Sequence, residues 1–212
     1  IPGHNLPLAS VGAFILWFGW FGFNPGSSLG AVGNWELIGE VVVNTFLASA
    51  AGGIATMFYT YFSYGKIDIT MVINGILAGL VSITAGCNVV DPMSAIFIGF
   101  IAGILVDLAV LFFDKMKVDD PVGAVAVHGV NGFFGTIAVG FFAAEGGLFF
   151  GGGAELLITQ LMGVVTIALF SFSFTFILMK VLKSSVGIRI TSDEEEAGID
   201  SVSFGVKSYS NE

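Results

Sequence analysis

His128 is the residue with the clearest chemical potential, because it lies inside an apolar segment that runs from Pro121 to Ala143. In a membrane-spanning segment an imidazole is costly in hydrocarbon, so it must face protein, water or a substrate. Burial disfavours the charged imidazolium, and the neutral ring offers one donor and one acceptor. We expect either a pore or proton-relay residue for a small polar substrate, or a structural histidine bonded to a neighbouring helix. Asn131, three residues further on, is expected on nearly the same face of the helix.

A second candidate site is the aromatic run near the start of the chain. Five aromatic residues occur within seven positions, and Gly19 and Gly22 open space beside the rings. Ring faces attract cations by about 0.5–2 kcal/mol, and Asn24 and Ser27 supply nearby oxygens. The run therefore predicts a site for a small cation that can donate hydrogen bonds. The alternative is an aromatic belt at a membrane interface.

The remaining polar candidates are weaker. Asp107 is a carboxylate inside an apolar segment, which makes it a functional candidate by default, although a structural role is equally open. Ser82 and Thr84 can bond carbonyls of their own helix. His4 is expected to be exposed or capping, and Cys87 is given no catalytic role. A single cysteine excludes an internal disulfide and a four-cysteine metal site, so we expect no metal and no cofactor.

Composition identifies the elements that must carry these residues. The 212 residues are 55% hydrophobic and only 11% charged, whereas soluble domains have roughly 25% charged residues. Six apolar segments have about the length of 20 residues that a membrane span requires. The sequence therefore predicts an all-α membrane protein with six transmembrane helices, which occupy residues 6–23, 37–62, 69–90, 93–113, 121–143 and 156–182.

Capping and packing signals support these boundaries. Asp91-Pro92 and Asp120-Pro121 are typical helix starts, since aspartate caps free backbone donors and proline is tolerated at the first helical position. Glycines one turn apart on the third and fourth helices predict close helix packing, and a further set marks a packing face on the fifth. These glycines are Gly75 and Gly79, Gly99 and Gly103, and Gly129, Gly132 and Gly135.

The charges predict an orientation. With six spans, all seven lysines and arginines fall on the side shared by both termini, which is therefore expected to be cytoplasmic. We divide the chain into a transmembrane domain, residues 1–183, and a cytosolic tail, residues 184–212. The net charge of −9 argues against nucleic-acid binding. The chain begins at Ile1 without a methionine, so we expect a fragment or a processed piece.

Two long motifs resemble the Amt branch of the ammonium transporter (Amt/Mep/Rh) superfamily. Residues 2–7 with residues 20–27 resemble its sixth transmembrane helix, and Asp119-Asp120-Pro121 with residues 127–132 resembles its tenth. The tail, with Gly187-Ile188-Arg189 and Gly198-Ile199-Asp200, is similar to the family's cytosolic tail. The resemblance implies helices six to eleven of an eleven-helix fold, that is, the second inverted repeat plus a final helix.

The resemblance also implies a function: transport of ammonium or ammonia across the plasma membrane by a homotrimer, through a hydrophobic pore lined by two histidines. A PII-type regulator at the tail is a further implied partner. The implied site consists of a pore histidine, His128; a gate phenylalanine, Phe23; a recruitment serine, Ser27; pore-wall residues Leu16, Trp20 and Thr84; and a structural aspartate, Asp120.

The residues leave two other functions to weigh. An ammonium sensor could use the same fold to signal to a fused or partner domain. An intramembrane hydrolase could pair His128 with a serine, but the chain has no Gly-x-Ser-x-Gly elbow, so we expect no enzyme activity.

Overall fold

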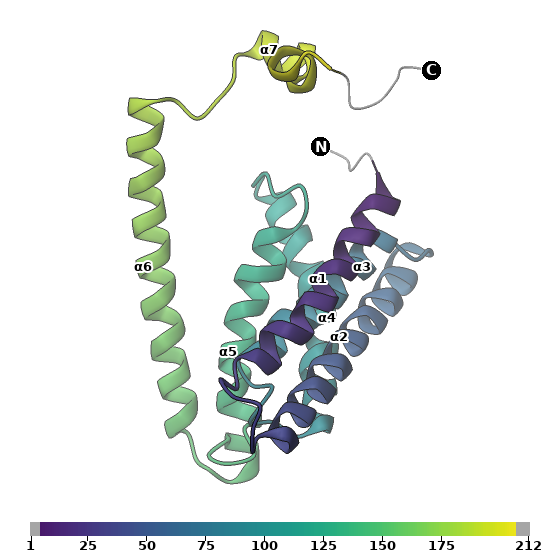
Figure 1. Cartoon of the computed structure of the whole chain (residues 1–212), viewed down its shortest axis with the longest axis vertical. Coiled ribbons are helices and arrows are strands. Elements are labelled where there is room, and N and C mark those ends of the chain that lie inside the picture. Colours follow the sequence, from purple (N-terminus) through teal and green to yellow (C-terminus); the bar gives the residue numbers. More distant parts are fainter. Residues whose placement is uncertain (1–4, 207–212) are drawn as a thin grey trace. The chain divides into compact units, whose positions relative to one another are not determined.

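The computed structural model describes residues 5–206, and within that range every regular element is a helix. The predicted all-α fold is confirmed (Figure 1). In chain order the elements are α1 (Leu6–Gly26), α2 (Trp35–Tyr64), α3 (Ile69–Thr84), α4 (Pro92–Lys115), the π-helix η1 (Val125–Val130), α5 (Asn131–Phe142), the 3-10 turn η2 (Leu148–Phe150), α6 (Glu155–Ser185), α7 (Ser192–Ala197) and the π-helix η3 (Asp200–Phe204).

Five of these helices are long and apolar enough to cross a membrane: α1, α2, α4, the continuous η1–α5 helix and α6. The third predicted span differs from the structure, because α3 has 16 residues and ends at Thr84 rather than at Val90. Beyond Thr84 the chain turns, and the Asn44 side-chain amide donates to the carbonyls of Cys87 at 3.0 Å and Val90 at 2.8 Å. A side chain of α2 therefore satisfies carbonyls that a longer helix would have bonded internally.

The chain forms two compact units, one up to Val164 and one from Val165 onward, so the division falls within α6. The first unit holds α1 to α5 and all candidate site residues. In the second unit, α7 begins at a capping box. The Thr191 backbone N–H donates to the Glu194 carboxylate at 2.8 Å and the Glu194 N–H donates to the Thr191 hydroxyl. The bond from the Thr191 backbone lowers the pKa of Glu194.

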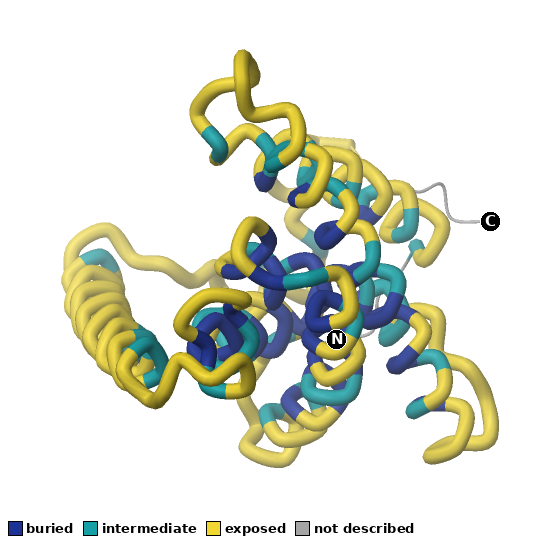
Figure 2. Tube along the Cα trace, turned by 90° about the horizontal axis from the view of Figure 1, so that it is seen from below, coloured by how far each residue is buried: buried dark blue, intermediate teal, exposed yellow. Residues whose placement is uncertain are grey.

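The core of the first unit lies where α2, α3 and α4 meet. Figure 2 shows the buried positions in dark blue, gathered where these helices face one another. The expected close packing of the paired glycines is confirmed. A Cβ at Gly79 or Gly99 would strike the backbone of Ala48, and one at Gly103 would strike the backbone of Gly52. These helices touch through backbone atoms, which only small residues permit.

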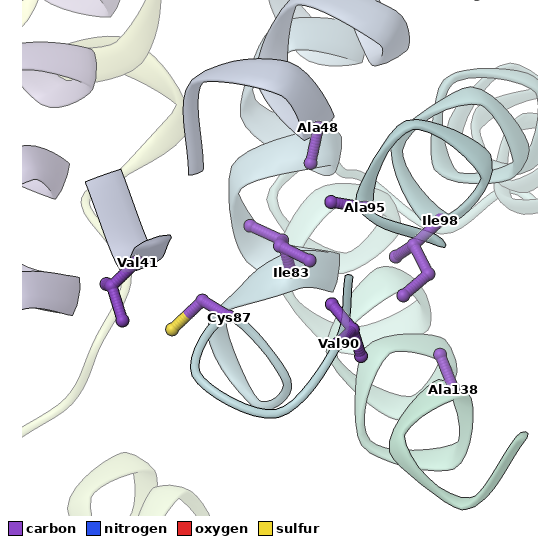
Figure 3. Close-up of a cluster of buried hydrophobic side chains, with 8 residues drawn as sticks. All are labelled: Val41, Ala48, Ile83, Cys87, Val90, Ala95, Ile98 and Ala138. Atoms are coloured by element: carbon purple, nitrogen blue, oxygen red, sulfur yellow. The ribbon is translucent and has the colours of Figure 1, made fainter. Parts of the chain in front are cut away.

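Small and branched side chains fill the space at one end of this core. Ala48 and Ile83 have no exposed surface, and Figure 3 shows them facing Ala95 and Ile98 of α4. The Cys87 thiol is buried in the same cluster. The full cluster is Val41, Ala48, Ile83, Cys87, Val90, Ala95, Ile98 and Ala138.

The helix start at Asp91-Pro92 is confirmed. The Asp91 carboxylate accepts from the backbone of Met93 at 2.9 Å and of Ser94 at 3.0 Å. Pro92 is the first residue of α4, where its missing N–H costs nothing. The Ser94 hydroxyl donates to the same carboxylate at 2.7 Å, and this bond is the main reason that the pKa of Asp91 is lowered.

Candidate functional site

His128 lies on the π-helical turn η1, not on a regular α-helical turn. Its side chain is exposed within this chain and lines a cavity of about 570 Å³ together with Leu16 of α1. The cavity wall is otherwise largely apolar, with Ala13, Leu77 and Val127 among its members.

Asp120 caps the helix that carries His128. Its carboxylate oxygens accept from the backbone N–H groups of Ala124 at 2.7 Å, Val125 at 2.8 Å and Ala126 at 3.4 Å. Pro121 is not the first helical residue, contrary to expectation, because it lies in a turn that Gly123 closes with φ of +73°. The carboxylate thus caps from four to six residues upstream, and the positive φ favours glycine at position 123.

Asn131 does not share a face with His128, so that expectation is wrong. Asn131 has no exposed surface, whereas His128 is exposed. A π-helix closes with i→i+5 bonds, so its turn is wider than that of an α-helix and residues three apart no longer line up. The glycine face is also narrower than expected: a Cβ at Gly135 would strike the Ser82 backbone, but Gly129 and Gly132 have ordinary clearances.

On α1 the aromatic run is held against α3 by a specific bond. The Trp20 indole N–H donates to the Thr84 hydroxyl at 2.8 Å, and that hydroxyl donates to the Leu80 carbonyl at 2.7 Å. Phe23 stands edge-on to Trp20, with ring centroids 6.1 Å apart, and is 60% exposed. Thr84 thus bonds a carbonyl of its own helix, as expected, and also fixes the orientation of the Trp20 ring.

Ser27 and Asn24 play different parts. The Ser27 hydroxyl donates to the Phe23 carbonyl at 2.9 Å, which leaves its oxygen as an acceptor beside a cavity of about 120 Å³ that Thr84 also lines. Asn24 is 3% exposed, and its amide donates to the Thr45 hydroxyl of α2 at 3.0 Å. Asn24 therefore ties α1 to α2, whereas Ser27 bonds only within α1 and lines the smaller cavity.

The predicted site residues thus fall into two neighbouring groups on the first unit. Leu16 and His128 line the larger cavity, Ser27 and Thr84 line the smaller one, and Trp20 is bonded to Thr84. Helix α1 contributes to both groups, with Leu16 and Trp20 four residues apart on it. His4, Pro2 and Gly3 of the first motif lie outside the described residues.

Asp107 is buried in the helix core, away from both cavities. It is 1% exposed, and its Oδ2 atom has no hydrogen-bond partner among residues 5–206. A side chain that reaches out to the membrane surface is therefore excluded. In the described part of the chain, no cluster of three histidine, cysteine, aspartate or glutamate side chains could hold a metal ion.

The roles of two buried asparagines were not predicted from the sequence. Asn44 holds the turn after α3, and Asn74 is 7% exposed at the wall of the larger cavity, where its amide lies against Gly123. The available signal was an amide within an apolar segment, where a polar side chain needs a structural or functional reason.

Comparison with known proteins identifies the family. The model of the Ammonium Transporter Family matches residues 1–209. The chain is 41% identical to Ammonium transporter Amt2 of Archaeoglobus fulgidus, over 100% of the chain and 47% of that protein. It is 36% identical to Ammonium transporter 1 member 1 of Arabidopsis thaliana, over 99% of the chain and 46% of that protein.

Solved structures agree. A structure named Sensor Amt Protein superimposes with a TM-score of 0.87 at 41% identity, over 94% of the chain and 49% of that structure. Candida albicans Mep2 gives a TM-score of 0.80 at 32% identity, over 87% of the chain and 43% of that structure. The chain spans about half the length of these relatives. The Archaeoglobus fulgidus and Arabidopsis thaliana proteins are named as transporters and not as enzymes. This chain belongs to the ammonium transporter family.

Proposed function

We propose that this chain supplies one wall of a path by which ammonium or ammonia crosses the membrane. The observation that carries the proposal is the cavity of about 570 Å³, in which the polar ring of His128 stands among apolar side chains of α1, α3 and η1. An apolar cavity with few polar groups disfavours a fully hydrated ion and admits a small molecule that can hydrogen bond. A neutral imidazole there offers one donor and one acceptor to ammonia or ammonium.

The group around Trp20 serves as the entrance to this path. The Ser27 oxygen accepts from an ammonium N–H, because its own proton is engaged by the Phe23 carbonyl. The ring faces of Trp20 and Phe23 add a cation–π attraction. Phe23, exposed and edge-on to Trp20, is the ring that would have to move aside for passage.

The test is His128→Ala in the complete gene product, reconstituted in liposomes and assayed for ammonium-driven current and ammonium uptake. We expect a flux that falls by about tenfold or a path that loses its selectivity for ammonium over potassium, because the polar group at the centre of the path is removed. Thr136→Ala is the control, since that hydroxyl bonds the Gly132 carbonyl of its own helix. Unchanged flux and selectivity in His128→Ala would refute the pore role.

An ammonium sensor is the second candidate, favoured by the similarity to a structure named Sensor Amt Protein. The discriminating experiment expresses the complete gene product in a cell that lacks ammonium uptake. Growth at low ammonium supports transport. Ammonium binding without growth, together with a change in a fused or partner domain, supports sensing.

The assembly and orientation follow the same proposal. We place both ends of the chain in the cytoplasm of a plasma-membrane homotrimer, with the tail available to a PII-type regulator. The distribution of lysine and arginine supports the orientation. A membrane-impermeant thiol reagent tests it: Ser28→Cys, in the loop after α1, should react from outside, and Ser201→Cys, in the tail, only after permeabilisation.

A further inference from the structure

The π-turn that carries His128 is held at its far end by two buried polar side chains. The Asn131 side-chain amide donates to the Ala126 carbonyl at 2.9 Å. The Ser82 hydroxyl of α3 donates to the Asn131 backbone carbonyl at 3.1 Å and approaches its side-chain oxygen at 3.3 Å. Both residues are at least 99% buried. We name this set of bonds the Ser82–Asn131 clamp.

We propose that Asn131 and Ser82 are positioning residues that hold the 125–130 segment as a π-helix and thereby aim the His128 ring into the larger cavity. This inference rests on the proposed pore role of His128.

The π-helical backbone of residues 125–130 requires stabilisation. A π-turn is rare and inserts an extra residue per turn, so something must stabilise it against the regular α-helix. The Asn131 amide bonds a carbonyl five residues earlier, which is the spacing of the π-helical bond itself. The side chain therefore reinforces the wide turn at its C-terminal end.

The helix that carries His128 is also fixed in its position against α3. A Cβ at Gly135 would strike the backbone of Ser82, so the two helices are in direct contact at this point. The Ser82 hydroxyl then reaches Asn131, four residues before Gly135. Contact and hydrogen bond together fix the rotation of the helix, and with Asn131 turned inward the wide turn places His128 on the outward, cavity-lining side.

At the opposite end of the turn, the Asp120 carboxylate accepts hydrogen bonds from the backbone N–H groups of Val125 and Ala126. His128 thus lies between two anchors, a carboxylate before it and the clamp after it. Removing the clamp lets the segment relax toward an α-helix, which rotates the imidazole with respect to the cavity while leaving the residue itself in place.

The experiment is a double-mutant cycle of Asn131→Ala and Ser82→Ala in the complete gene product, assayed in liposomes beside His128→Ala and the Thr136→Ala control. We expect a flux loss of about tenfold for Asn131→Ala and about threefold for Ser82→Ala. The double variant should be no worse than Asn131→Ala, because Ser82 acts through Asn131. The ammonium-to-potassium selectivity should change in parallel.

A spectroscopic readout separates positioning from loss of folding. In the protein labelled with ¹⁵N-histidine, the imidazole resonance that disappears in His128→Ala identifies His128. That resonance should shift in Ser82→Ala, the milder variant, and stay unchanged in Thr136→Ala.

The outcomes are distinct. If His128→Ala alters flux but both clamp variants match Thr136→Ala in flux, selectivity and resonance position, the clamp is structural and the inference is overturned. If His128→Ala itself behaves like the unmodified protein, it is the proposed pore function that fails. A variant that does not fold is replaced by Ser82→Cys, for which a shifted His128 resonance supports the inference and an unshifted one opposes it.

Discussion

The core formed by α2, α3 and α4 and the surface formed by α1 and η1 are built in opposite ways. In the core, glycines bring helix backbones into contact, and eleven residues of α2 alone are buried. Helix α1 has only two buried residues, Ala13 and Asn24, and the candidate site residues Leu16, Phe23 and His128 are exposed. The core is therefore buried within this chain, whereas most of the candidate site surface is exposed in it.

Disrupting the core should destabilise the protein more than any other change considered below. Gly79→Leu places a side chain onto the backbone of Ala48, so α2 and α3 must separate, and we expect about 3 kcal/mol or more of destabilisation. Gly19→Leu, at a glycine of α1 with nothing within 4 Å, is the matched control and should not destabilise the fold. Thermal unfolding in detergent measures both; equal melting temperatures would contradict the contrast.

Next in size is the cap on the site surface. Asp120→Ala removes the acceptor for the free N–H groups at the start of the His128 helix and should cost about 1–2 kcal/mol. Asp120→Asn keeps one acceptor oxygen and should cost less. The unfolding midpoint gives the stability, and hydrogen exchange at residues 124–126 reports the local opening. Equal exchange in both variants and the unmodified protein would show that the cap is dispensable.

A smaller effect is expected where the two regions are joined. Thr84→Val keeps the shape of the side chain but leaves the Trp20 indole N–H without its partner, at a cost of about 1 kcal/mol. Because the orientation of the Trp20 ring is lost, we expect ammonium flux through the complete gene product to fall even though the free energy of unfolding changes only slightly. Thr84→Ser, which keeps the hydroxyl, should restore both; if it does not, packing of the methyl group rather than the bond orients Trp20.

The smallest effect is a pH dependence at the edge of the core. The pKa of Asp91 is lowered in the folded protein, chiefly by the Ser94 hydroxyl. Its contribution is therefore present above the unfolded pKa and is lost as pH falls through the folded pKa. Asp91→Asn should flatten the acid side of the stability profile, measured as the unfolding midpoint against pH. An unchanged acid slope would assign that slope to other carboxylates.

Much of the fold follows from local signals. Apolar length predicted the helices, and Asp91-Pro92 predicted the start of α4 because a capping aspartate followed by proline acts within one turn. The same signal misled at Asp120-Pro121, since Gly123 allows a turn that moves the helix start downstream. The early end of α3 could not be predicted from local sequence, because it depends on hydrogen bonds from Asn44 to carbonyls more than 40 residues further along the chain.

The candidate site divides along the same line. The sequence was enough to identify His128, Trp20 and Ser27 as candidates, because the cost of a polar group in hydrocarbon depends on local composition. Their hydrogen-bond partners could not be predicted in this way. Trp20 bonds Thr84, which lies 64 positions away, and Asn131 bonds Ser82, which lies 49 positions away.

Local signals in the sequence are therefore enough to predict a helical membrane protein, the start of most of its helices, and the side chains that could meet a small polar substrate. Which of those side chains face a cavity depends on how distant segments pack. His128 is turned outward and Asn131 inward because a π-turn changes the angular spacing of residues, and that turn is bonded across helices by Ser82. Local composition sets the cost of a polar residue, but the packing of distant segments sets the direction in which it points.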